Sequence, residues 1–338
     1  MKLAIIGAGR TGRGFIARLF TSQAQIYFFD SDRELIEKLR GAGRFAVRYF
    51  DGRETDYITG YHAFWTGEPC DALTECECVF VSVGAENTGG AGKWLEPYIR
   101  PDAAVIACEN APLPSALFHG ALRDRAGSGA IFCTTVSDGA LDIAGESVPT
   151  LYTDDKVGVA ASLSGIEIVP DFAVLMQRKL YTYNAASAII AYLGAQKGYE
   201  AYADAANDPQ IESELDRFYV AINAAVCAEY GIETDAQARF AALSKLKFQN
   251  RSIADSISRN AASPERKLSP SERIVMPARL ISKHGGDTAP LIKTAVAALR
   301  YMGAADAARA REILLGICNL TPGEALFEGV MRQYQISR

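Results

Sequence analysis

The feature that most constrains the fold is a glycine-rich turn near the start of the chain. Residues 2–6 form a short apolar run, which ends in Gly7-Ala8-Gly9-Arg10-Thr11-Gly12 before a helical pattern of apolar residues. A strand, a glycine turn and a helix in this order are typical of a dinucleotide-binding unit. Gly9 would let a pyrophosphate approach backbone N–H groups, and Gly12 would let the helix pack on the strand. We therefore predict cofactor contacts at Gly7, Gly9, Arg10, Thr11 and Gly12.

The end of the second strand predicts which dinucleotide binds. Residues 25–29 are apolar and lead to Asp30, eighteen residues beyond Gly12. A carboxylate there accepts both ribose hydroxyls of an adenosine and repels a 2′-phosphate, which favours NAD over NADP. The alternative is that Asp30, with Ser31, only caps the next helix.

Further apolar runs predict a doubly wound, Rossmann-type sheet. They cover residues 78–83, 104–108 and 130–135, and their ends carry Val83 and Gly84, Asn110, and a polar segment that includes Asp142. Ligands bind beyond the carboxyl ends of such strands, so these four residues are site candidates, with Val83, Gly84 and Asn110 beside the cofactor. Helix capping explains Asn110 and Asp142 equally well.

Two hairpins are predicted within this α/β half. Residues 45–50 and 54–61, joined by Asp51-Gly52, alternate with a period of two and predict a β-hairpin inserted in the nucleotide-binding unit. Residues 151–152 and 157–160 predict a second, shorter hairpin.

From Pro170 onward, alanine-rich helical patterns replace the strand signals. We predict a dinucleotide-binding domain over residues 1–165 and an all-helical substrate or catalytic domain over residues 166–338. The first long helix carries Lys179, Asn184 and Ser187 within an arc of about 140° at 100° per residue. One face of this helix would therefore present an amine, an amide and a hydroxyl among apolar neighbours.

Lys179 is the chemically informative member of that face. Burial disfavours the charged ammonium and lowers the pKa of a lysine, which makes the neutral amine available as a general base. The alternative is an ordinary helix in which Lys179 extends its amine to solvent and Asn184 bonds a neighbouring turn. The polar loop region at 251–267 offers a second group of cations, including Arg259 and Lys267. These would hold an anionic or hydroxyl-rich substrate if they face a cleft.

Composition limits the partners. The net charge of −5 gives no basic field for nucleic acid, and no long apolar stretch predicts a membrane span. Seven scattered cysteines, an odd number, and no signal peptide lead us to expect free thiols and a cytoplasmic protein. The only close pair, Cys76 and Cys78, lacks a second pair or a nearby histidine, so we expect no metal site.

Several motifs resemble the polyol-specific long-chain dehydrogenases over nearly the whole chain. They are Gly7-Ala8-Gly9 with Gly12-Arg13-Gly14-Phe15-Ile16, Ile106-Ala107-Cys108-Glu109-Asn110, Arg178-Lys179-Leu180, Ala191-Tyr192-Leu193-Gly194, and Arg266-Lys267-Leu268-Ser269 with Glu272-Arg273. The family signature is a lysine, four residues, an asparagine, two residues and a histidine. Lys179 and Asn184 match its first two terms.

The resemblance implies a role for each candidate. Lys179 would be the general base and Asn184 would stabilise the developing alkoxide, while Asn110 and Asp142 would line the substrate pocket. Arg259 and Lys267 would hold the substrate, a polyol or sugar phosphate such as mannitol 1-phosphate or fructose 6-phosphate. The implied enzyme is a metal-independent, NAD-dependent oxidoreductase that acts on a secondary alcohol as a monomer or homodimer.

Two positions depart from the family pattern. Ser187 stands where the signature has histidine, and Ile143 stands where the family has an arginine after the pocket aspartate. Serine can donate a hydrogen bond but is shorter and carries no charge at neutral pH. Two alternatives therefore stay open: an NAD-binding regulator with lost or altered activity, and an oxidoreductase of sugar acids of the uronate or altronate type, whose carboxylate would also suit basic residues.

Overall fold

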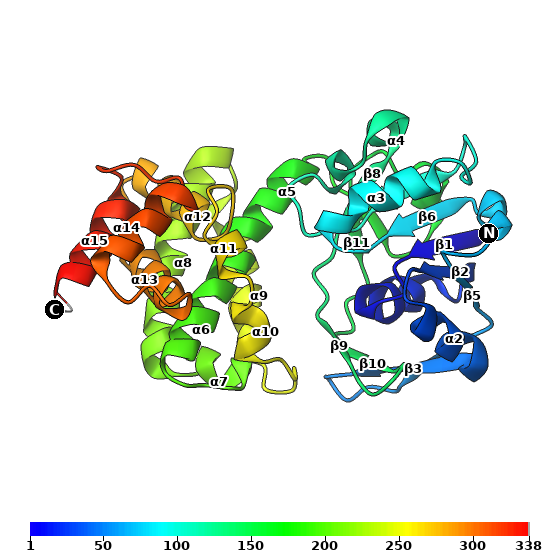
Figure 1. Cartoon of the computed structure of the whole chain (residues 1–338), viewed down its shortest axis with the longest axis horizontal. Coiled ribbons are helices and arrows are strands. Elements are labelled where there is room, and N and C mark those ends of the chain that lie inside the picture. The colour runs from blue at the N-terminus through cyan, green and yellow to red at the C-terminus, as the bar shows by residue number, and fades with distance from the viewer. Residues whose placement is uncertain (337–338) are drawn as a thin grey trace. The chain divides into compact units, whose positions relative to one another are not determined.

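The computed structural model describes residues 1–336, which form two compact units (Figure 1). The first unit is Met1–Met176 and the second is Gln177–Arg338, so the division falls inside helix α5 (Phe172–Lys179). The first unit is built on β-sheets and the second on helices. This agrees with the predicted fold class.

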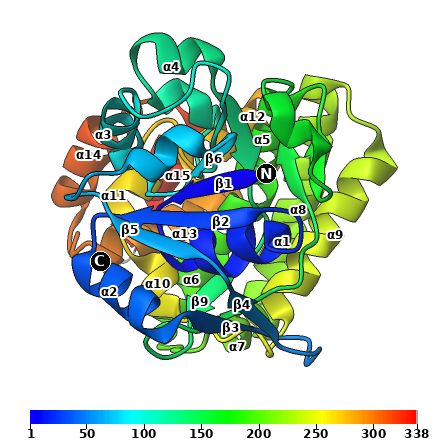
Figure 2. The ribbon, with the colours of Figure 1, turned by 90° about the vertical axis from the view of Figure 1, so that its right-hand side faces the viewer.

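The first unit is organised around an eight-stranded sheet with the order β12-β11-β8-β7-β6-β1-β2-β5. The six strands from β5 to β8 run parallel, and Figure 2 shows β1, β2 and β5 side by side. The order β5-β2-β1-β6-β7-β8 is the doubly wound arrangement. In it, successive strands are added toward one edge of the sheet from β1 to β5 and toward the other edge from β6 onward, so the order of addition reverses between β1 and β6. The strands are β1 (Lys2–Ile6), β2 (Gln25–Asp30), β5 (His62–Trp65), β6 (Cys78–Val81), β7 (Ala104–Ala107), β8 (Gly127–Ala130), β11 (Leu151–Thr153) and β12 (Ile166–Ile168).

The central strands are apolar throughout because both faces of the sheet are covered. Leu3 and Ile5 of β1 pack with Phe15 and other residues of the glycine-turn helix, while Ala4 and Ile6 pack on the opposite face with α3. The helices of this unit are the π-helical η1 (Gly12–Ala17) with α1 (Arg18–Phe20), then α2 (Arg33–Ala42), α3 (Ala85–Leu95) and α4 (Gly120–Arg125), with short 3₁₀ turns η2 (Asp71–Glu75), η3 (Pro114–Leu117) and η4 (Gly158–Ser162).

The predicted inserted hairpin is present. Strands β3 (Arg44–Tyr49) and β4 (Asp56–Thr59) pair antiparallel and form a second sheet with β9 (Thr135–Ser137) and β10 (Ile143–Gly145). Two other predictions were wrong. The run at 130–135 is not one strand, because β8 ends at Ala130 and β9 begins in the second sheet at Thr135. The hairpin at 151–160 does not form, because β11 pairs with β8 and β12, and residues 158–162 are the 3₁₀ turn η4.

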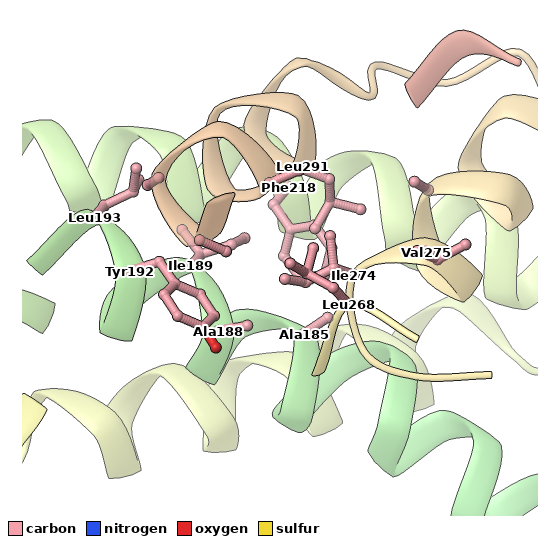
Figure 3. Close-up of a cluster of buried hydrophobic side chains, with 14 of the residues drawn as sticks. Ala185, Ala188, Ile189, Tyr192, Leu193, Phe218, Leu268, Ile274, Val275 and Leu291 are labelled. Atoms are coloured by element: carbon pink, nitrogen blue, oxygen red, sulfur yellow. The ribbon is translucent and has the colours of Figure 1, made fainter. Parts of the chain in front are cut away.

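The second unit is helical throughout its described part, residues 177–336. After α5 come the π-helical η5 (Leu180–Asn184), α6 (Ala185–Gln196), α7 (Tyr202–Ala206), α8 (Pro209–Tyr230), α9 (Thr234–Gln249), α10 (Ile257–Ala261), α11 (Pro264–Lys267), α12 (Val275–Lys283), α13 (Ala289–Tyr301), α14 (Ala307–Gly316) and α15 (Ala325–Ile336). Figure 3 shows α6 contributing Ala185, Ala188, Ile189 and Tyr192 to a buried cluster with Phe218 of α8 and Leu291 of α13. The helix that carries the candidate lysine therefore continues into the centre of this core.

Candidate functional site

A cavity of about 600 Å³ lies at the carboxyl ends of the central strands of the first unit. It stands between β1 and β6, where the strand order reverses and where doubly wound sheets bind ligands. Its volume is within the usual range for ligand sites. The lining residues are Ile6, Gly7, Gly9, Phe29, Asp30, Ser31, Thr66, Ser82, Val83, Glu86, Asn87, Gly90, Ala91 and Trp94.

Steric space around the glycine turn separates its members. A Cβ atom on Gly7, whose φ is +97°, would lie 2.4 Å from the carbonyl oxygen of Ser82, and one on Gly12 would lie 2.0 Å from the carbonyl oxygen of Gly7. Both positions therefore require glycine for packing. Gly9 differs, because a Cβ there meets nothing within 4 Å and the cavity is open beside it. Arg10 is exposed and Thr11 half-buried at the helix start, and neither lines the cavity, so their cofactor contacts stay predictions.

The carboxylate of Asp30 closes the glycine turn and also lines the cavity. Its two oxygens accept the N–H of Ala8 at 2.7 Å and the N–H of Asp32 at 2.9 Å. The N-cap of α2 is Asp32, whose carboxylate accepts the N–H of Leu35 at 3.0 Å. The alternative that Asp30 is only a helix cap therefore loses its main support. Each oxygen of Asp30 keeps a further lone pair for a ribose hydroxyl.

Val83 and Gly84 follow β6, and Glu109 and Asn110 follow β7. Val83 lines the cavity, and the N–H of Gly84 donates to the carboxylate of Glu109 at 2.8 Å. Burial raises the pKa of Glu109 to about 7, against the N–H donors of Gly84 and Val83, which favour the charged form. Asn110 is exposed within its own unit. Val83, Gly84 and Asn110 thus follow adjacent strand ends, as predicted, and Glu109 lies beside them.

In the second unit, a π-helical turn separates Lys179 from Asn184. The N–H of Ala185 donates to the carbonyl of Leu180, five residues back, which defines the π turn between α5 and α6. In a regular α-helix two residues five apart point about 140° away from each other. A π turn holds more residues per turn than an α-helix, so a residue and the one five positions later point in more similar directions. Lys179 and Asn184 therefore lie on nearly the same face.

The environment of Lys179 favours its neutral form. The side chain is buried, with 8% of its surface exposed, and its pKa is lowered to about 7. Burial is the main cause, and the positive charges of Lys247 and Arg273 add to it. A lysine with a pKa near 7 is partly neutral at physiological pH and can accept a proton.

Residues 171–314 match the family model described as the mannitol dehydrogenase C-terminal domain. Over its length the chain is similar to mannitol-1-phosphate 5-dehydrogenases. That of Thermoanaerobacter pseudethanolicus is 26% identical, over 84% of this chain and 82% of the relative. That of Oceanobacillus iheyensis is 29% identical, over 89% and 87%. These matches confirm the resemblance to the polyol-specific long-chain dehydrogenases.

A solved structure of mannitol 2-dehydrogenase from Pseudomonas fluorescens, in a ternary complex with NAD and D-mannitol, shares the fold. Its TM-score is 0.79, with 15% identity, and the match covers 99% of this chain and 91% of that chain. At this identity the similarity establishes the architecture alone. Both units of the chain thus have a counterpart in that fold.

The segment that matches this family model, residues 171–314, contains Lys179, Asn184 and Ser187 together with both predicted substrate cations, Arg259 and Lys267. Lys267 is buried and donates to the carbonyl of Asn260, and its pKa is lowered to about 7, mainly by burial. Arg259 is exposed and pairs with Asp255 at 2.7 Å.

Asp142 is engaged with the inserted hairpin. Its carboxylate accepts the N–H of Ala46 at 2.9 Å and pairs with Arg48 at 3.0 Å. Arg48 thus supplies a guanidinium to Asp142 although residue 143 is isoleucine. The role of Asp142 in a substrate pocket remains a prediction.

Three further residues act on, or lie beside, the candidate site residues and are not among the candidates predicted from the sequence. Glu109 was quoted only as part of a motif, although a carboxylate at a strand end beside Asn110 could have been chosen on the same grounds. Arg273 is buried and acts electrostatically on both Lys179 and Lys267. Tyr202 lies next to Ser187. Arg273 and Tyr202 lie outside the segment that contains Lys179 and Ser187, so no local sequence pattern could have placed them beside these residues.

Proposed function

We propose that the chain is an NAD-dependent dehydrogenase that oxidises a secondary alcohol of a polyol phosphate. The first candidate pair is mannitol 1-phosphate, which the names of the curated relatives contain, and fructose 6-phosphate, the ketose expected from its oxidation. The observation that carries this proposal is the buried Lys179, with a pKa near 7, one π turn from Asn184 in a mannitol dehydrogenase C-terminal domain.

The first unit fits the predicted cofactor. Gly9 leaves open space beside the cavity for a pyrophosphate, and Asp30 presents a carboxylate to it for ribose hydroxyls. NAD, when bound, would supply the hydride acceptor. Gly7, Gly9, Asp30 and Val83 would hold it, and the negative charge of Asp30 would disfavour the 2′-phosphate of NADP.

The chain's own groups handle the proton and the oxygen. Neutral Lys179 takes the hydroxyl proton at its Nζ, and the amide N–H of Asn184 donates to the oxygen as negative charge develops there. Lys267, Arg259 and Arg273 place positive charge in the same domain, which suits a phosphate. This chemistry needs no metal ion. Free thiols at all seven cysteines support a cytoplasmic location. No helix in residues 1–336 is long and apolar enough to cross a membrane.

Ser187, in place of the signature histidine, motivates a second candidate function, a cofactor-binding regulator without turnover. A sugar-acid substrate is a further alternative, because its carboxylate would suit the same cations as a phosphate.

The test is oxidation of NADH, followed at 340 nm, with fructose 6-phosphate, fructose and tagaturonate, in the wild type and in Lys179→Ala. We expect turnover of a ketose that falls by at least about a hundredfold in the variant, whereas NADH binding is retained. Equal turnover in the two proteins excludes Lys179 as the base. A preference for NADPH contradicts the role of Asp30.

A further inference from the structure

Tyr202, the first residue of α7, carries a buried hydroxyl group that lacks a well-formed hydrogen bond. Its side chain is 5% exposed, and within residues 1–336 the hydroxyl has no partner in normal hydrogen-bond geometry, although Ser187 is close enough to act on it. Leaving a buried hydroxyl without a good hydrogen bond lowers stability, so a protein that retains one often does so for function. The tyrosine is therefore a candidate for a hydrogen bond to Ser187 that becomes well formed when substrate is bound.

The Tyr202 ring is held firmly in place. It packs edge-on against Phe248, with centroids 5.8 Å apart and planes at 76°. Its backbone N–H donates to the carbonyl of Asp255 at 3.0 Å. Ser187 interacts with the hydroxyl, and Tyr219, Asp255 and Arg273 act on it electrostatically. Asp255 is itself paired with Arg259, a predicted substrate cation.

Ser187 connects this hydroxyl to the candidate site. It follows Asn184 by three residues, and residues three apart on a helix are neighbours on one face. Ser187 is half-buried, whereas the Tyr202 hydroxyl behind it is fully covered. Arg273 acts electrostatically on both Tyr202 and Lys179. A ligand beside Lys179 and Asn184 would therefore meet Ser187 before Tyr202.

Burial raises the pKa of Tyr202 far above its ordinary value. The phenol keeps its proton throughout the neutral range, so it can donate a hydrogen bond and cannot act as a base. Ser187 can accept that hydrogen bond and still has its own O–H to donate.

We propose that Tyr202 is a substrate-positioning residue that acts through Ser187. Its O–H donates to Oγ of Ser187, and this orients the serine O–H toward a hydroxyl of the bound polyol. The hydroxyl groups of Tyr202 and Ser187 would then form a chain of two hydrogen bonds that orients the substrate. The inference rests on the proposed function, because it requires a polyhydroxylated substrate beside Lys179.

The experiment compares Tyr202→Phe, Ser187→Ala and the double variant with the wild type in steady-state ketose reduction. Each single variant should raise the KM for the ketose roughly tenfold, the loss of about one hydrogen bond, and leave the KM for NADH unchanged. The double variant should show no further increase, because both substitutions break the same chain of hydrogen bonds.

Tyr334→Phe serves as the matched control. Tyr334 is equally buried in α15, and its hydroxyl donates to the carbonyl of Ala304 at 3.0 Å. We expect this variant to lower Tm without changing the KM for the ketose. An unchanged KM in Tyr202→Phe, or additive effects in the double variant, overturns the role of Tyr202 alone. Absence of turnover with every ketose in the wild type overturns the proposed function and the role of Tyr202 together.

Discussion

Lys179 and Asn184 lie one π-helical turn apart, and the same helix then continues as α6 into the buried core of the second unit. The extra residue in that turn aligns an amine and an amide that a regular helix would separate. π turns of this kind occur often at functional sites, because the less regular hydrogen bonding is retained only where geometry requires it. This pair is the basis of the following predictions about catalysis.

The pH dependence of turnover should follow Lys179. Alcohol oxidation needs the neutral amine, so its rate should rise through about pH 7 and level off above it. Ketose reduction needs the ammonium and should fall over the same range. Arg273→Gln removes a positive charge that lowers the pKa of Lys179, so the oxidation limb should move to higher pH. Lys267 also has a pKa near 7, and a limb that disappears in Lys267→Gln would assign it to that residue instead.

Lys179 should also lower the stability of the fold below neutral pH. Its folded pKa of about 7 is below its unfolded value of 10.5, so folding releases a proton between these two pH values and must bury the charged ammonium below pH 7. The destabilisation is complete below pH 7 and disappears as pH rises toward 10.5. Lys179→Met should therefore raise the free energy of unfolding by roughly 2–4 kcal/mol at pH 6 and much less at pH 10. Urea unfolding at both pH values measures this, with the exposed Lys93→Met as control.

Two alanine substitutions in the glycine turn should separate binding from folding. Gly9→Ala meets no protein atom within 4 Å, so Tm should stay within a few degrees while NADH affinity falls at least tenfold. Gly12→Ala brings a methyl group to 2.0 Å from the carbonyl oxygen of Gly7 and should lower Tm strongly. Thermal denaturation and NADH fluorescence titration make the comparison. Full NADH affinity in Gly9→Ala would show that the pyrophosphate binds elsewhere.

Glu109 should make the first unit less stable as pH rises. Its folded pKa of about 7 is above the ordinary value of 4.5, so stability is lost between these two pH values, because the carboxyl group ionises in the unfolded chain while the buried one keeps its proton. Glu109→Gln keeps an acceptor for the N–H of Gly84 and removes the charge. We expect it to gain on the order of 1 kcal/mol at pH 8, after allowance for solvent screening, and nothing at pH 4.5. Equal gains at both pH values would exclude ionisation as the cause.

Ser187→His should not restore the family signature by itself. The Tyr202 side chain already lies beside residue 187, so an imidazole there would be overpacked. We expect the single variant to lose stability without gaining activity on mannitol 1-phosphate, and Ser187→His with Tyr202→Ala to accept the larger ring. Tm and the KM for mannitol 1-phosphate distinguish the two proteins. Activity gained by the single variant would instead indicate that histidine alone was missing.

Local patterns predicted much of the first unit. The glycine turn, the apolar strands predicted before residue 110 and the hairpin at Asp51-Gly52 are specified by neighbours in sequence, and the structure contains them. The run at 130–135 was misassigned because an apolar stretch does not show where one sheet ends and another begins. The 3₁₀ turn at 158–162 was missed because five residues carry too little periodicity to distinguish it from a strand.

The sequence alone determined that a nucleotide-binding unit precedes a helical domain with a lysine, an asparagine and a serine in one helix. It did not determine their geometry, since hydrophobic spacing cannot reveal a single π turn. The pKa of Lys179 depends on burial and on the charges of Lys247 and Arg273, and the environment of Ser187 depends on Tyr202. These partners come from distant segments, so only the packing of the helices could bring them together, and with them the electrostatics that lower the pKa of Lys179.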